Sequence, residues 1–167
     1  MNPFDAQRRT WLSLCSLGLL TLAGCATPRP NSANNAEPFW SGRLGLQLQS
    51  TDPQYWSASF ELKGSAAQGQ LVLLTPIGTT LAQLSWTPQS ALLEQGKDRM
   101  IGKDLKTLTQ KLTGTELPIG DLFEWLSGRF GSATDWQVDL SAYSQGRVIA
   151  KKSFSGPEAV LRILIDR

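Results

Sequence analysis

Apolar and polar residues alternate along much of this chain. Residues 43–49 alternate leucine with glycine or glutamine, and residues 56–63 alternate bulky apolar side chains with polar ones. A period of two predicts strands with one buried face, as in antiparallel sheets. Shorter runs separated by turn residues predict further strands at residues 70–75, 80–86, 91–94, 99–101, 136–140, 146–154 and 160–165.

In the middle of the chain the apolar period lengthens to that of a helix. Leucines three or four residues apart predict a helix over residues 103–112, with Gly114 as its C-terminal cap. A second helix is predicted after Pro118, with Asp121 near its N-terminus and an end before Gly128. Strands, two helices and strands again, joined by short connections, predict an α+β fold whose antiparallel sheet carries the helices on one face.

The N-terminus has the three-part layout of an export signal. Arg8 and Arg9 precede an apolar run over residues 11–22, and small residues stand directly before Cys25. The apolar run is shorter than the roughly 20 residues that cross a bilayer core, so a permanent transmembrane helix is not expected. The segment that ends at Cys25 resembles a bacterial lipobox, which implies cleavage before Cys25 and attachment of lipid to this cysteine.

The remaining chain divides into a tether and one domain. Residues 26–38 are rich in Pro, Asn, Ala and Ser and have no periodic apolar face, which is typical of a flexible tether. The expected organisation is a lipoprotein signal peptide at 1–24, a lipidated flexible tether at 25–38 and a folded domain at 39–167.

The composition excludes several kinds of catalytic and metal site. The chain has no histidine, so neither a Ser-His-Asp centre nor a histidine-ligated metal is possible. Asp135 and Asp139 are the closest carboxylates beside an aromatic residue, but residues four apart in a strand lie about 13 Å from each other, too far for paired acid catalysis. We therefore expect no enzyme activity, no metal and no cofactor.

The charges give no indication of a nucleic-acid partner. The formal net charge is +2 at pH 7, with both signs interspersed. The pair Lys151-Lys152 is interpreted as a solvated strand end. A single tryptophan is more often part of a core than of a ligand site. Strands and helices that each offer one apolar face can nevertheless either pack solid or curl around an apolar cavity, and periodicity does not distinguish the two.

Several motifs of the chain resemble those of the LolB family of outer-membrane lipoprotein receptors. Residues 112–119 read LTGTELPI and are followed by Leu122, Trp125, Leu126 and Gly128, which is similar to the family's "LTG…LP…L..WL.G" signature. Residues 57–61 and 71–78 resemble its "A.F.W" and "L.L..PLG" strands, and residues 42–44 fit its opening strand.

The resemblance implies an incomplete, half-open antiparallel β-barrel covered by helices. Its cavity would accept the acyl chains of lipoproteins from a LolA-type periplasmic carrier, and the protein would insert these lipoproteins into the outer membrane. The implied protein is a monomer, anchored by lipid in the outer membrane and facing the periplasm; Ala26 after the lipidated cysteine is compatible with that location. The implied cavity residues are Leu44, Leu46, Trp56, Phe60, Leu71, Leu73, Trp86, Leu105, Leu108, Leu122 and Trp125.

The turn formed by Pro76, Ile77 and Gly78 is the second implied site. An isoleucine is unexpected at a Pro-X-Gly turn. Ile77 either folds back onto the body or, as the resemblance implies, projects from it and helps cargo to enter the membrane.

Two departures from the family pattern concern the C-terminal half. Gly128-Arg129-Phe130 stands where the family usually has Gly-X-Pro, and Trp136 follows so soon that one strand or hairpin of the family is expected to be missing. The alternative function is a lipid-anchored envelope scaffold of the same fold, which would have a filled core and an exposed apolar patch that binds a protein partner.

Overall fold

The computed structural model describes residues 37–50, 52–154 and 156–167. The predicted signal peptide, Cys25 and nearly all of the predicted tether lie outside the described residues. Within them, nine strands form one antiparallel sheet in the order β6-β5-β4-β3-β2-β1-β9-β8-β7. The two end strands, β6 and β7, are not paired with each other, so the sheet is open, and the α+β class predicted from the sequence is confirmed.

The elements follow the predicted order closely. The strands are β1 (Phe39–Gln49), β2 (Gln54–Gly64), β3 (Gly69–Leu74), β4 (Thr80–Trp86), β5 (Ala91–Gln95), β6 (Asp98–Gly102), β7 (Trp136–Asp139), β8 (Arg147–Lys152) and β9 (Glu158–Ile165). The helices are α1 (Leu105–Thr113), α2 (Ile119–Leu126) and the short 3-10 helix η1 (Tyr143–Gln145), which the sequence did not predict.

The alternation of apolar and polar residues along the strands places the apolar side chains on the inner face of the sheet. In β1 the leucines at 44, 46 and 48 are buried, while the residues between them are half-buried. The same side of β2 carries Ala58, Phe60 and Leu62. All three pair with residues of β1, and Phe60 and Leu62 also pair with residues of β3. These side chains form one continuous core, and every buried apolar residue of the described chain lies between Leu44 and Ile163.

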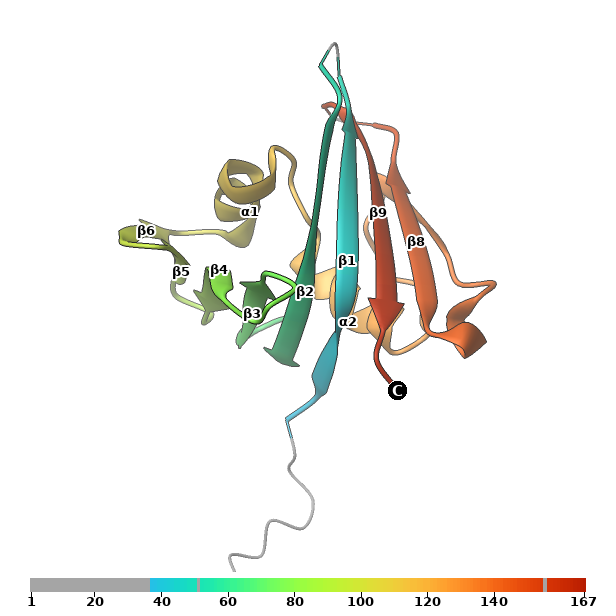
Figure 1. Ribbon diagram of the computed structural model, residues 1–167, viewed down its shortest axis with the longest axis horizontal. Coiled ribbons are helices and arrows are strands. Elements are labelled where there is room, and N and C mark those ends of the chain that lie inside the picture. The colour runs from blue at the N-terminus through green and yellow to red at the C-terminus, as the bar shows by residue number, and fades with distance from the viewer. Residues whose placement is uncertain (1–36, 51, 155) are drawn as a thin grey trace, which may run out of the picture. The chain divides into compact units, whose positions relative to one another are not determined.

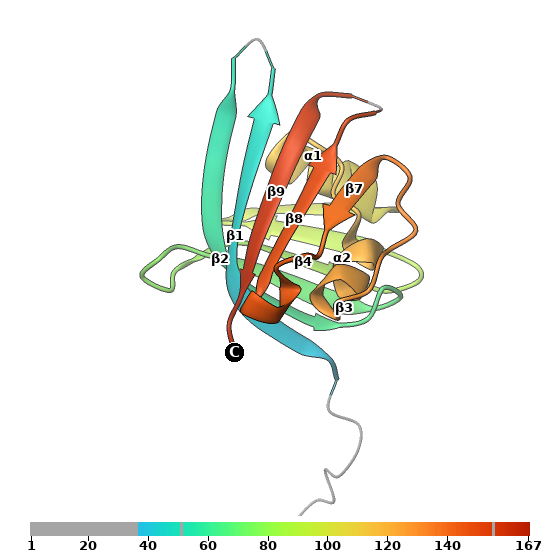
Figure 2. The same ribbon diagram turned by 90° about the vertical axis from the view of Figure 1, so that its right-hand side faces the viewer.

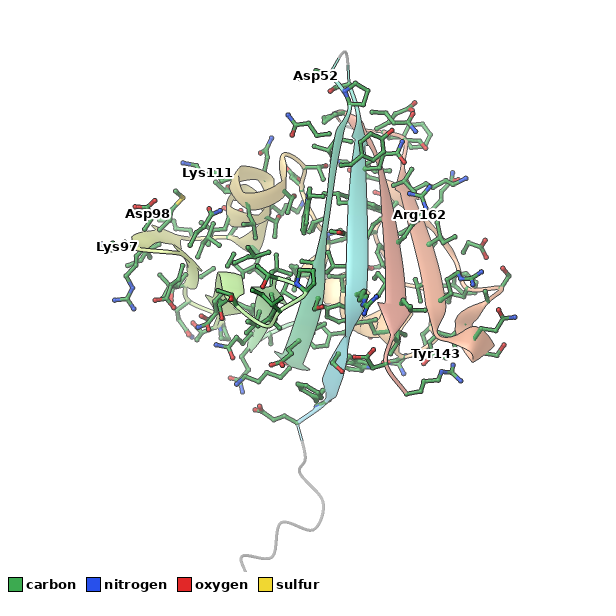
Figure 3. All side chains as sticks on the ribbon, viewed as in Figure 1. Asp52, Lys97, Asp98, Lys111, Tyr143 and Arg162 are labelled. Atoms are coloured by element: carbon green, nitrogen blue, oxygen red, sulfur yellow. The ribbon has the colours of Figure 1, made fainter. Side chains whose placement is uncertain are left out.

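The sheet bends strongly, so that its two halves run in different directions. The strands β2, β1, β9 and β8 lie side by side (Figure 1), and β3 and β4 run across them (Figure 2). Figure 2 shows both helices on the same side of the long strands as β3 and β4. Labelled charged side chains such as Asp52, Lys97 and Arg162 lie at the outside of the fold (Figure 3), and all three are exposed.

Local capping explains where α1 begins and ends. The helix was predicted from residue 103, but Asp104 is extended and its carboxylate accepts a hydrogen bond of 2.8 Å from the backbone N–H of Thr107. Gly114 ends the helix with a φ of 81°, as predicted, because glycine adopts this left-handed conformation without a Cβ clash. Neither α1 nor α2 has the length and apolar character to span a bilayer.

Candidate functional site

An apolar pocket lies between the inner face of the sheet and the two helices. Six of the eleven predicted cavity residues line it: Leu44, Trp56, Phe60, Leu71, Leu73 and Leu122. Leu46, Trp86, Leu108 and Trp125 are buried in the core but do not line this pocket, and Leu105 lines a second, more polar cleft.

Seven further residues line the pocket without having been predicted from the sequence. They are Leu62, Thr109, Leu112, Leu117, Leu126, Leu161 and Ile163. Most carried a signal, since Leu62, Leu161 and Ile163 continue the alternation of predicted strands and Leu112 continues the stripe of the first helix. Thr109 gave no signal, because a threonine in a helix is ordinarily interpreted as a surface residue.

The pocket is nearly filled. Its volume is about 20 Å³, enough for about one water molecule and far below the several hundred Å³ of typical ligand sites. The indole Nε1 of Trp56 is buried and has no hydrogen-bond partner among the described residues. The lining therefore has the predicted apolar character, whereas the sizeable open cavity expected of a receptor is not present in this conformation.

Buried threonines connect α1 to the segment that follows it. Thr109 Oγ1 donates to the carbonyl of Lys106 at 2.9 Å and accepts from the backbone N–H of Leu117 at 3.1 Å. Thr113 Oγ1 donates to the carbonyls of Thr109 and Thr115. Leu108 is the only apolar side chain of α1 that is fully buried. Leu105 and Leu112 pack against the core while only partly buried, so α1 buries fewer apolar side chains than α2.

Helix α2 is anchored much more firmly. Five of its eight residues are buried. The ring of Phe123 meets the rings of Trp40 and Trp86 edge-on, with centroids 5.6 Å and 6.2 Å apart. Trp125 packs beside Trp136 of β7 with centroids 6.2 Å apart. These aromatic contacts fix α2 against strands from both halves of the sheet.

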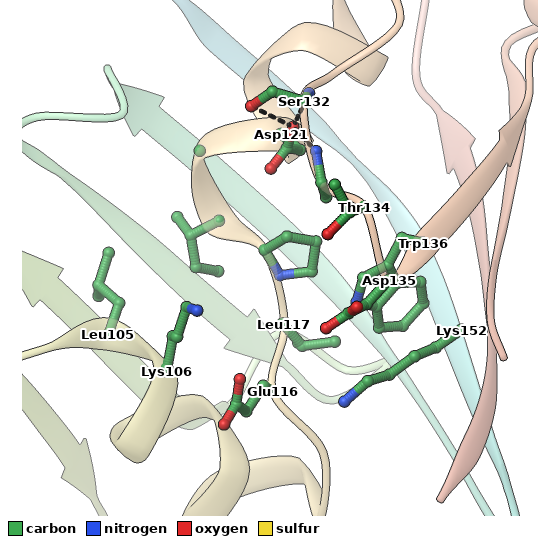
Figure 4. Close-up of a pocket in the computed structure, with 14 residues that line it drawn as sticks. Leu105, Lys106, Glu116, Leu117, Asp121, Ser132, Thr134, Asp135, Trp136 and Lys152 are labelled. Atoms are coloured by element: carbon green, nitrogen blue, oxygen red, sulfur yellow. Dashed lines mark hydrogen bonds between the residues drawn. The ribbon is translucent and has the colours of Figure 1, made fainter. Parts of the chain in front are cut away.

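A second cleft of about 380 Å³ lies beside the apolar pocket (Figure 4). It is lined by α1, by the segment around Glu116 to Asp121, by residues 132–136 and by Lys152. The carboxylate of Asp121 accepts hydrogen bonds from the backbone N–H groups of Ser132 and Ala133. Asp121 was predicted to stabilise the N-terminus of α2, and it also fixes the loop that forms one wall of the cleft.

The interpretation of Lys151-Lys152 as a solvated pair is wrong for one of its members. Lys151 is exposed, but Lys152 is only 5% exposed. The reason is the pleat of β8, which directs successive side chains to opposite faces. Lys152 therefore shares the inner face with Val148 and Ala150.

The turn at residues 75–79 carries its isoleucine outward. The backbone N–H of Gly78 donates to the carbonyl of Thr75 at 2.9 Å, and Gly78 has a φ of 84°. Ile77 at the tip is 88% exposed, so it does not fold back onto the body. The role of Pro76, Ile77 and Gly78 in membrane insertion stays a prediction.

Asp135 and Asp139, which were not expected to act as an acid pair, have different surroundings in the structure. Asp139 accepts a hydrogen bond of 2.9 Å from the backbone N–H of Ser141, and this bond holds the pKa of Asp139 below its usual value. Asp135 lines the second cleft. Over the ranges that the structure describes, no three carboxylate or cysteine side chains are grouped closely enough to hold a metal ion.

Comparisons with known proteins identify relatives across most of the chain. The family model described as outer membrane lipoprotein LolB matches residues 39–158. The outer-membrane lipoprotein LolB of Shewanella loihica is 28% identical over 166 residues, which cover 94% of this chain and 75% of that protein. The LolB proteins of Pectobacterium atrosepticum and Shewanella sp. strain MR-7 are 30% and 34% identical, and the alignments cover 77% and 78% of this chain and 70% and 65% of the relatives.

Proposed function

This chain belongs to the family of the outer membrane lipoprotein LolB, and from this premise we propose that it is a lipid-anchored receptor of the outer membrane. It accepts lipoproteins from a LolA-type periplasmic carrier, holds their acyl chains between sheet and helices, and inserts them into the outer membrane. The names of its relatives, each an outer-membrane lipoprotein, support the location and the class of protein.

The observation that carries this proposal is the apolar lining of the inner pocket. Twelve of the thirteen lining side chains are apolar and none is charged. The one polar side chain, Thr109, already donates and accepts hydrogen bonds within the chain. Such a lining favours hydrocarbon, since each buried methylene contributes about 0.8 kcal/mol. It binds acyl chains without an energy source, and releases them when a membrane offers an equivalent apolar environment.

We propose that the pocket enlarges when α1 moves away from the sheet. Helix α1 is attached to the sheet more weakly than α2. The buried residues of α1 are one leucine and two threonines, whereas α2 buries five apolar residues. The open sheet and the two helices then act as an incomplete barrel with a movable cover. The unpartnered Nε1 of Trp56 supports this opening, since a buried donor without an acceptor gains free energy when a ligand carbonyl or water reaches it.

The proposed organisation follows from the sequence. Residues 1–24 act as the signal peptide, Cys25 carries the lipid, residues 25–38 form the tether and residues 39–167 form the receptor domain. The tether keeps the domain near the membrane surface, where the exposed Ile77 can enter the lipid. The protein acts as a monomer and without catalysis.

One observation favours the alternative, a lipid-anchored scaffold of the same fold. The interior is nearly filled, with about 20 Å³ of free volume in the apolar pocket. Exposed aromatic side chains such as Phe130, 73% exposed, provide apolar surface outside it. A scaffold would keep this interior closed and would bind its partner through the surface.

Ligand binding by the unlipidated chain from residue 26 to 167 distinguishes the two functions. This part contains every buried apolar residue of the described core. The receptor is expected to bind a fluorescent hydrophobic probe saturably. A synthetic diacylated peptide should displace the probe from the pocket. Trp56→Ala is expected to weaken probe binding roughly ten-fold. Tyr55→Ala is the matched control, because Tyr55 is adjacent but 70% exposed. A folded chain that binds no probe would support the scaffold instead.

A further inference from the structure

A lysine occupies an inner-face position of the sheet. Lys152 ends β8, whose inward positions are otherwise apolar, and its side chain is among the buried residues at 5% exposure. Lysine is almost never buried to this degree unless its charge is paired, because removing an ammonium group from water is unfavourable. The position of Lys152 therefore requires groups that accept hydrogen bonds from its ammonium group.

The chain itself provides only one weak hydrogen-bond acceptor for Lys152. Nζ of Lys152 donates to Oγ1 of Thr115 at 3.4 Å, at the long limit for a hydrogen bond. An ammonium group has three donors, so two stay unused in this contact. The ion pairs in the described part of the chain are Arg99–Glu94 and Arg129–Glu124, and neither includes Lys152.

The same ammonium group faces a cleft that is large enough for a ligand. Lys152 lines the cleft of about 380 Å³ described above, and its side chain extends from β8 into it (Figure 4). Leu117 lines both this cleft and the apolar pocket. A molecule with an apolar and a polar part could therefore lie in both at once, with its polar part beside Lys152.

The charged side chains that line the cleft indicate which polar group of a ligand would bind there. Lys106 and Lys152 are balanced by Glu116 and Asp135, while Asp121 already accepts hydrogen bonds from Ser132 and Ala133. A site without a net positive charge does not favour phosphate. It suits an uncharged group rich in carbonyl oxygens, which accept from an ammonium group.

We propose that this cleft is the head-group subsite of the receptor and that Lys152 donates hydrogen bonds to ester or amide carbonyl oxygens of the acylated ligand. The proposal rests on the proposed function, because the acyl chains occupy the adjacent apolar pocket. Lys152 thereby distinguishes an acylated cysteinyl peptide from a plain hydrocarbon, a distinction that the apolar lining alone cannot make.

The test compares Lys152→Met with Lys151→Met in the chain from residue 26 to 167. The two lysines are neighbours on β8, but Lys151 is exposed. Two ligands are titrated against tryptophan fluorescence: a synthetic diacylated cysteinyl peptide and an alkyl-pyrene without ester or amide groups. Lys152→Met is expected to weaken binding of the peptide about ten-fold or more, as for loss of a charged hydrogen bond. It should leave alkyl-pyrene binding unchanged, and Lys151→Met should change neither.

A second readout separates binding from folding. Because Lys152→Met removes a poorly paired buried charge, its Tm is expected to equal or exceed that of the wild type. Equal losses for both ligands, or unchanged binding of the peptide, would overturn the subsite. Competition by inorganic phosphate that depends on Lys152 would also overturn it in favour of an anion site. If the wild type binds neither ligand, the proposed function itself fails, which is a different result from loss in the variant alone.

Discussion

The ring of Phe123 stands edge-on to the ring of Trp40, with centroids 5.6 Å apart and an angle of 74° between the planes. Phe123 lies on α2 and Trp40 near the start of β1, so this contact joins the second helix to a central strand of the sheet. Trp86 meets the same phenyl ring from β4. One side chain thereby connects the two halves of the bent sheet.

Removal of this ring is expected to destabilise the whole domain. Phe123→Ala should lower the free energy of unfolding by about 3–5 kcal/mol, because a buried phenyl ring and two aromatic contacts are lost. Urea unfolding followed by tryptophan fluorescence measures the change. The matched control is Phe130→Ala, since Phe130 is 73% exposed and should change stability little. Equal effects of the two substitutions would contradict the role of Phe123.

A disulfide between the start of α2 and the β2–β3 turn tests which helix moves. A Cβ placed on Gly120 would lie 3.6 Å from Cβ of Ala66, within the range of about 3.5–4.5 Å seen in disulfides. The chain from residue 26 to 167 has no other cysteine. Oxidised Ala66→Cys/Gly120→Cys should have a higher Tm than its reduced form and should still bind the hydrophobic probe, because α1 provides the opening. Probe binding that appears only after reduction would instead identify α2 as the moving helix.

The cap of α1 is expected to respond to acid. Hydrogen bonds from the backbone N–H and the hydroxyl of Thr107 hold the pKa of Asp104 below its usual value. A lowered pKa in the folded chain means that this contribution to stability is complete above the pKa of the unfolded chain and is lost as the pH falls below about 4, through the folded pKa. Asp104→Ala should therefore lower Tm by a few degrees at pH 7 and by less at pH 3.

Asp104→Asn is the control for this experiment. Asparagine keeps the acceptor of an N-terminal cap but does not titrate. Its Tm should lie close to that of the wild type at pH 7. A difference between wild type and Asp104→Ala that does not change with pH would show that the charge of Asp104 contributes nothing.

Two tryptophans differ in what their indole N–H contributes. Nε1 of Trp86 donates to the carbonyl of Ser65 at 3.1 Å, whereas Nε1 of Trp56 is buried without a partner among the described residues. Trp86→Phe removes this hydrogen bond, so we expect it to be more destabilising than Trp56→Phe by about 0.5–1.5 kcal/mol, since the carbonyl belongs to the exposed Ser65 and water can replace the indole. Chemical denaturation of both variants provides the comparison. A larger loss for Trp56→Phe would mean that its N–H has a partner in solution.

The exposed isoleucine of the 75–79 turn is expected to act in delivery and not in folding. Ile77→Ser should leave Tm and probe affinity unchanged, because Ile77 is 88% exposed. It should slow the transfer of a diacylated peptide to phospholipid vesicles, since an apolar tip favours entry into the interface. Ile101→Ser is the matched control, at 79% exposure on β6. If both variants transfer equally well, Ile77 has no special role.

The sequence by itself determined the elements and the faces of this protein. Alternation placed Leu44, Leu46 and Leu48 on the buried side of β1, and the helical stripe and Gly114 located α1. These features follow from local geometry, because the period of two in a strand and of 3.6 in a helix fixes which side chains share a face. The motifs at residues 42–44, 57–61, 71–78 and 112–128 also carried the resemblance to the LolB family, because short motifs are a property of the sequence itself.

Only the tertiary structure decided how much space those faces leave and which polar groups they enclose. The pocket volume depends on how closely Leu112, Leu117 and Leu126 approach the sheet, a matter of packing between segments far apart in the chain. The burial of Lys152 also depends on packing between distant segments, and the sequence did not predict it. The sequence alone predicts that a basic pair at a strand end is solvated, but the pleat directs Lys152 inward, where its ammonium group contacts Thr115 in the segment after α1. Burial is a property of the assembled layers and not of a single strand.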